Sequence, residues 1–171
     1  MNIFVSEYKR YKSLLESSIE QVSEEDVFKK LGEQGNSIAV ILKHISGNLL
    51  SRFTDFLTTD GEKEWRDRES EFHVGKTTKA ELLEIWSNSW NVLEDSVFSL
   101  CPEDMNKIVT IRGAQFTVEE ALARSLSHFS CHVGQIMYLG KHFAGKNWQY
   151  LTIRPGESSQ YNKNPTKEKG S

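Results

Sequence analysis

SHFSCHVGQIMYL, residues 127–139, places two histidines four positions apart within a long helical pattern that ends at Gly145. Residues at i and i+4 lie on the same face of a helix, with their Cβ atoms roughly 6 Å apart. His128 and His132 can therefore direct their imidazole rings at one metal ion. The remaining ligand would have to come from another part of the chain.

His44 is the candidate third ligand. It lies in residues 36–53, NSIAVILKHISGNLLSRF, where apolar residues recur at helical spacing. The apolar stripe comprises Ile38, Ile41, Ile45, Leu49, Phe53 and Phe56. Three neutral histidines suit zinc, nickel, copper or ferrous iron and leave one or more coordination positions for water or substrate. The alternative is that all three rings are ordinary hydrogen-bonded histidines of a core.

Four long helical segments can be delimited from caps and apolar periodicity. They run over about 3–21, 37–57, 78–101 and 117–144, and the last two begin at the capping boxes Thr78/Glu81 and Thr117/Glu120. A short helix should follow Ser23 and end at Leu31, and β-branched residues over 107–118 suggest a small hairpin. The sequence therefore predicts an all-α four-helix bundle with a short extra helix, a hairpin before the last helix and an irregular C-terminal tail. We expect one domain over 1–160 and a disordered tail over 161–171.

Composition excludes several classes of function. The formal net charge is −3, and the basic residues are scattered among acidic ones, so we expect neither a nucleic-acid groove nor a surface for anionic membranes. The first residues, MNIFVSEYKRYK, hold no apolar run long enough for a signal peptide, and no later segment approaches the length of a membrane span, so we expect neither. Two distant cysteines, Cys101 and Cys131, fit a reducing compartment better than a disulfide framework. These features predict a cytoplasmic protein. Cys131 points about 100° away from its neighbour His132 around the helix, so we interpret it as a small core residue in preference to a metal ligand.

Four polar residues are candidates for contact with a substrate or with the metal ligands. Asn48 lies one turn from His44 and could orient a bound water or substrate. Asp55 lies about 16 Å along the helix axis from His44, so it could face a substrate, or it could simply pair with Arg52 near the helix end. Gln135, one turn beyond His132, could donate to a metal-bound oxygen or make a structural hydrogen bond between helices.

Other polar residues are expected to lie away from the site. His142 lies about 15 Å along the helix axis from His132, which is too far to share one ion. The charged connection through Trp65 and Glu71 to Gly75 is expected to be exposed.

Two stretches carry a resemblance to a known family. They are NSIAVILKHISGNLLSRFTDFLTTDGEKEW over 36–65 and LSHFSCHVGQIMYLGKHFAGKNW over 126–148, supported by IRG at 111–113 and GESSQYN at 156–162. With these motifs the chain resembles the DinB-like superfamily of four-helix metalloenzymes, and within it a bacterial subfamily known only as a domain of unknown function. The resemblance implies a divalent metal, usually nickel or zinc, bound by His44, His128 and His132.

The resemblance also suggests an activity. Characterised DinB-like relatives include transferases that join a low-molecular-weight thiol to an electrophile and a thiol-dependent isomerase. A metal with an open position can hold a thiol as its nucleophilic thiolate at neutral pH. We therefore expect a metal-dependent thiol S-transferase or a hydrolase that acts on a small molecule, with the catalytic residues themselves unassigned. The alternative is a non-catalytic, metal-stabilised homodimer that serves as a binding or structural module, because bundles of this kind often dimerise.

Overall fold

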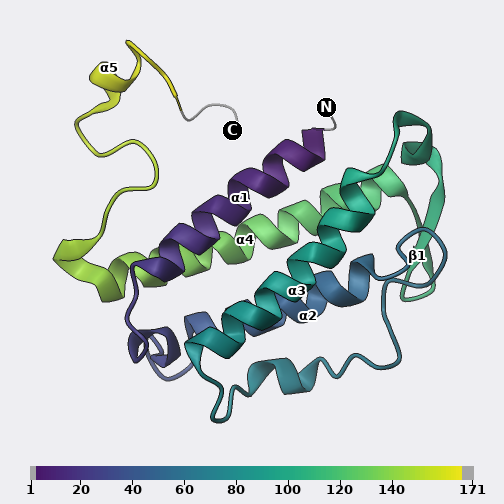
Figure 1. Ribbon diagram of the computed structural model, residues 1–171, viewed down its shortest axis with the longest axis horizontal. Coiled ribbons are helices and arrows are strands. Elements are labelled where there is room, and N and C mark those ends of the chain that lie inside the picture. The colour runs from purple at the N-terminus through teal and green to yellow at the C-terminus, as the bar shows by residue number, and fades with distance from the viewer. Residues whose placement is uncertain (1–2, 167–171) are drawn as a thin grey trace.

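The computed structural model describes residues 3–166 and confirms the predicted all-α bundle. Its long helices are α1 (Ile3–Glu20), α2 (Ile38–Phe53), α3 (Lys79–Phe98) and α4 (Val118–Ala144). In Figure 1, α1 runs along α4 and α3 runs along α2, while α2 also packs on α4. This packing between α2 and α4 matters most for function, because the predicted metal ligands lie on these two helices.

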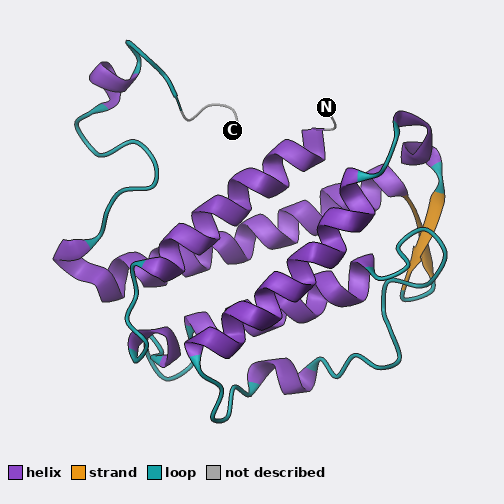
Figure 2. Cartoon of the chain, in the orientation of Figure 1, coloured by secondary structure: helices purple, strands orange, loops and turns teal. Residues whose placement is uncertain are grey.

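Shorter elements connect the helices. They are the 3-10 turns η1 (Asp26–Phe28), η2 (Glu69–Phe72), η3 (Pro102–Asn106) and η4 (Gly145–Asn147), the strands β1 (Ile108–Ile111) and β2 (Ala114–Thr117), and the one-turn helix α5 (Ser158–Tyr161). The predicted short helix after Ser23 is thus only the single 3-10 turn η1. The two strands form the expected antiparallel hairpin, drawn in orange in Figure 2.

The core is apolar and rich in aromatic rings. Tyr8 of α1 stacks on Phe129 of α4 with ring centroids 6.0 Å apart, and Trp86 of α3 lies on Phe129 at 5.9 Å. The predicted α2 stripe is buried at every position. Each large aliphatic side chain removed from water contributes roughly 1.5–3 kcal/mol, so burial of this core is a major favourable term in the packing of the helices.

Local signals set most of the helix ends. Ser37 caps α2, and the two predicted capping boxes are present at the starts of α3 and α4. The predicted end of α2 at Leu57 is wrong, because the helix stops at Phe53. Asp55 adopts a left-handed backbone conformation with φ of 48°, and Thr58 and Thr59 donate to its carbonyl, so the chain turns there.

The α2–α3 connection, residues 54–78, lies along α2 and is tied to it. Lys43 Nζ on α2 donates to the carbonyls of Ser70 and His73 at 2.8 and 2.7 Å. The prediction of an exposed connection is correct for Trp65, which is 57% exposed, and wrong for Glu71, which is 5% exposed. The connection therefore supplies a buried carboxylate beside α2.

The hairpin turn is held by an aspartate of the same connection. Arg112 and Gly113 both have positive φ, and their N–H groups donate to the two carboxylate oxygens of Asp60 at 2.8 Å each. Two successive positive φ values are typical of the type I′ turns that join two-residue hairpins. The hairpin is thus held against the α2–α3 connection, with Arg112 at its tip.

The C-terminal segment returns to the bundle at Trp148, which is 7% exposed and packs over Gly140 of α4. Of the expected disordered tail, residues 167–171 lie outside the described part of the chain, and residues up to Tyr161 form α5. None of the described helices is long and apolar enough to cross a membrane.

Candidate metal centre

The three predicted histidines come together between α2 and α4. One ligand nitrogen from each of His44, His128 and His132 lies within 4.8 Å of the others, close enough for all three to bind one ion. The Nε2 atoms of His128 and His132 are 3.1 Å apart, and the His44 ring lies 5.4 and 5.1 Å from these two rings. Within residues 3–166, no aspartate, glutamate or cysteine joins this group as a further candidate ligand.

Two of the rings are oriented by acceptors behind them. His44 Nδ1 lies 2.8 Å from Glu71 Oε2, and His132 Nδ1 lies 2.8 Å from Gln135 Oε1. When Nδ1 carries the proton and donates it, Nε2 keeps a free lone pair for a metal. Histidine ligands of metals usually have such a hydrogen-bonded partner, so the donor set fits a divalent ion. Gln135 thus contacts the candidate ligand His132 through its acceptor oxygen. The sequence had instead suggested that its amide donates to a metal-bound oxygen.

Electrostatics keeps the α4 histidines neutral. Burial, followed by the proximity of His132 and His44, lowers the pKa of His128 to about 4. Burial also lowers the pKa of His132, against the effect of its bond to Gln135. Both rings are therefore unprotonated at neutral pH, which is the form that binds metals.

Glu71 is the residue of the candidate site that the sequence did not reveal. It accepts a hydrogen bond from His44 and two from Arg66, at 2.8 and 3.1 Å, and Arg66 also lies 3.4 Å from Glu62. Burial raises the pKa of Glu71, but the hydrogen bonds from His44 and Arg66 outweigh it and bring that pKa below its usual value. An ionised Glu71 is the stronger acceptor for His44.

Gly47 makes room for this carboxylate. A Cβ atom at Gly47 would overlap Glu71 Oε1 and Cδ. Glycine within a helix lowers stability by roughly 1 kcal/mol relative to alanine. Gly47, in the middle of α2, is therefore the one sequence feature that indicates close approach of another side chain to this helix.

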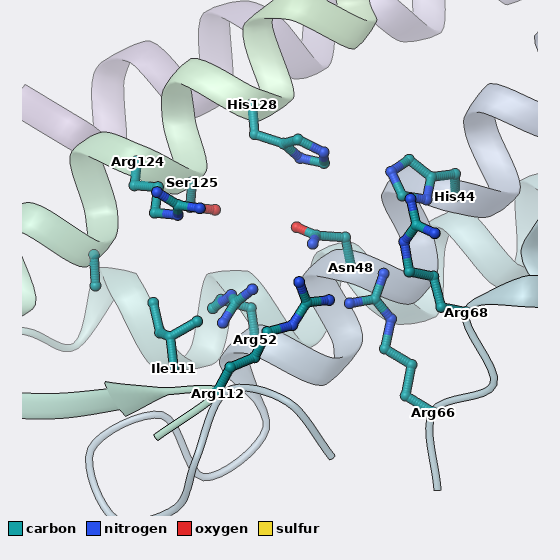
Figure 3. A pocket seen from close by; sticks show the side chains of 11 residues that line it. His44, Asn48, Arg52, Arg66, Arg68, Ile111, Arg112, Arg124, Ser125 and His128 are labelled. Atoms are coloured by element: carbon teal, nitrogen blue, oxygen red, sulfur yellow. The ribbon is translucent and has the colours of Figure 1, made fainter. Parts of the chain in front are cut away.

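A cavity of about 250 Å³ opens beside the histidines (Figure 3). It is bordered by His44 and His128, by the predicted residues Asn48 and Arg52, and by Ser125. A group bound in it would face the ligand cluster directly.

Asp55, by contrast, is not brought to this site. It lies beyond the end of α2, is exposed, and borders a different cavity with Phe56 and Leu57. His142 lies outside the histidine cluster, as expected. Cys131 is exposed, so its prediction as a core residue is wrong: it points away from the packed face of α4.

The low pKa of His128 has a measurable consequence for stability. In the unfolded chain this ring has the ordinary value of 6.5, whereas in the folded protein it is about 4. Between these values the unfolded state binds more protons, so a falling pH lowers the free energy of unfolding, and above 6.5 the contribution is constant. We expect the Tm of metal-free protein to fall less steeply from pH 6.5 to 4 in the His128→Gln variant than in the wild type. Thermal unfolding at intermediate pH values tests this, and parallel curves would contradict it.

Comparison with known protein families matches residues 1–157 to the family described as "Protein of unknown function (DUF1572)". No curated protein and no solved structure matches the chain. The match spans all four long helices and the three clustered histidines.

Proposed function

The chain belongs to DUF1572, a family of unknown function, and from the geometry of its site we propose that it is a divalent-metal enzyme. His44, His128 and His132 hold one ion, with zinc or nickel as the best candidates. The observation that carries the proposal is the convergence of three histidine nitrogens beside a cavity, with no fourth candidate ligand among the described residues. Catalytic metal sites commonly have three protein ligands and a position left for substrate or water, whereas structural sites are closed.

The proposed reaction is the attack of a thiol or a water molecule on a small electrophile: the nucleophile gives its proton to solvent, its sulfur or oxygen bonds to the attacked atom, and a bond from that atom to its leaving group breaks. A divalent ion held by the three histidines would favour the deprotonated form of either nucleophile at neutral pH. Glu71 and Gln135 hold the rings of His44 and His132 in the orientation that binding requires. The Asn48 amide borders the cavity and can hydrogen-bond a substrate there. We place thiol S-transfer, with a low-molecular-weight thiol as cosubstrate, ahead of hydrolysis, because the motifs resemble those of DinB-like transferases.

A second candidate is a homodimeric binding module without catalysis. A second, apolar cavity further along α4 favours it, because Tyr138, which is 69% exposed, and Leu31, which is 41% exposed, both border that cavity. In such a module the histidines would only stabilise the bundle.

Metal content and activity separate the two candidates. Protein purified without an affinity tag is expected to contain about one zinc or nickel ion per chain by elemental analysis. It should then accelerate a reaction in a screen of small thiols against electrophiles, and the His128→Ala variant should not. A full complement of metal that raises the Tm, with no activity in either a thiol or a hydrolysis screen, would favour the structural module. Absence of metal after growth and purification with zinc and nickel present would contradict both a catalytic and a structural site.

A further inference from the structure

The cavity beside the histidines is lined by arginines. Arg52, Arg66, Arg68, Arg112 and Arg124 all border it, and none of the lining residues is acidic. Figure 3 shows that they come from separate parts of the fold: α2, the α2–α3 connection, the hairpin and α4. The whole chain has a net charge of −3, so this concentration of positive charge is local.

Carboxylates outside the cavity neutralise only some of these arginines. Arg66 is paired with Glu71 and Glu62, and Arg112 is also paired with Glu62, at 3.1 Å. Arg68 is paired with an exposed neighbour, Glu69, at 3.2 Å. Glu62 is thus shared between Arg66 and Arg112. The five arginines around the cavity are paired with only three carboxylates among the described residues.

Arg52 and Arg124 have no ion pair among the described residues. The Nη1 atom of Arg52 is buried and has no hydrogen-bond partner within residues 3–166. Burial lowers the pKa of Arg52, and although Glu62 opposes this, Arg66, Arg112 and Arg124 lower it further. Ser125, which is 5% exposed, borders the same cavity and lies beside the Tyr8 hydroxyl. A buried donor without an acceptor is costly, so the Arg52 guanidinium is arranged for an acceptor that binds in the cavity.

Arg112 occupies a position where arginine is unfavourable. Its φ of 54° is left-handed, and the first residue of a type I′ turn is preferentially asparagine, aspartate or glycine. This backbone strain occurs at the residue whose side chain borders the cavity, as is common for residues of binding sites.

We propose that this cavity binds the doubly negative head group of a small substrate, a phosphate or a dicarboxylate, and holds it next to the three histidines. Planar guanidinium groups bind such oxyanions through paired, charge-assisted hydrogen bonds. The volume of about 250 Å³ suits a head group and a few further atoms, not a large ligand. The proposal names the substrate class of the proposed enzyme and in that respect rests on it, but anion binding itself can be measured without metal.

The test is titration calorimetry on metal-free protein, dialysed free of chelator, at pH 7.5 and low ionic strength. The probes are inorganic phosphate, succinate and acetate. We expect one phosphate or succinate per chain and at least about tenfold weaker binding of acetate, and the tighter of the two dianions identifies the head group. Arg124→Gln should weaken binding of that dianion roughly tenfold, because one charge-assisted contact is lost. Arg154→Gln, which removes another exposed arginine that does not border the cavity, should leave the affinity for that dianion unchanged.

Arg112→Asn separates binding from folding. It creates an Asn-Gly turn, so the Tm should stay the same or rise by up to about 3 °C, while dianion binding falls roughly tenfold. Equal affinity in wild type, Arg124→Gln and Arg112→Asn, or no binding of either dianion, would overturn the proposal. If the protein binds zinc and no dianion, the metal site stands and this inference is removed. If it binds a dianion through the arginines and fails to bind added zinc, this inference stands and the metal site is removed.

Discussion

Replacing His128 with alanine is expected to lower the affinity of the protein for Zn²⁺ more than about a hundredfold while leaving the bundle folded. Four-ligand zinc sites bind with roughly 10–16 kcal/mol, so one ligand accounts for about 3 kcal/mol, which is a factor of a hundred or more. The ring of His128 is only partly buried and its Nδ1 has no partner in the described part of the chain, so its removal costs only the 3.1 Å contact with His132 Nε2. The Tm of the metal-free variant should stay within about 3 °C of the wild type.

The measurement is zinc titration against a competing chelator, with Tm recorded before and after zinc is added. Zinc should raise the Tm of the wild type, because the ion binds only the folded state, and should not raise that of the variant. His142→Ala is the matched control, since His142 is on the same helix and outside the cluster. Equal zinc affinity in His128→Ala and His142→Ala would show that the cluster is not the binding site.

Replacing Glu71 with alanine is expected to affect both stability and metal affinity. The side chain of Arg66 is 3% exposed and would keep only its longer contact with Glu62, at 3.4 Å. Removing one partner of a buried ion pair costs about 3–5 kcal/mol, which corresponds to a fall in Tm of roughly 10 °C for a chain of this size. His44 Nδ1 would also lose its acceptor, and loss of such a partner typically costs 10–100-fold in metal affinity.

Glu69→Ala is the control for this variant. Glu69 belongs to the same 3-10 turn, but its side chain is 83% exposed and its ion pair with Arg68 lies on the surface. Exposed pairs contribute about 0–1 kcal/mol, so its Tm and zinc affinity should be nearly unchanged. If Glu71→Ala behaved like Glu69→Ala in zinc affinity, Glu71 would have no part in orienting His44.

Most of the fold could be predicted because its signals are local. The capping boxes at Thr78 and Thr117 and the apolar stripe of α2 each depend on residues a few positions apart, and all are found in the structure. The failures occurred where a longer-range contact or a backbone conformation decided the outcome. The early end of α2 depends on the left-handed Asp55, which no periodicity reveals.

The candidate ligands could be predicted and their surroundings could not. His128 and His132 are placed by helix geometry, and His44 by its position in α2. Glu71 is 27 residues from His44, within a charged connection that has the composition of a solvent-exposed loop. The arginines of the cavity are likewise spread from Arg52 to Arg124, so only the packing of α2, the hairpin and α4 brings them together.

Of the four long helices, only α2 and α4 contribute to the candidate site, and this determines where the protein can tolerate amino-acid substitutions. No residue of α1 or α3 belongs to the histidine cluster or lines the cavity beside it. Those two helices need only keep an apolar face, and many substitutions of similar volume satisfy that requirement. Substitutions in that half of the molecule should therefore have little effect on its chemistry, whereas in α2 even a single methyl group at Gly47 would displace the carboxylate of Glu71.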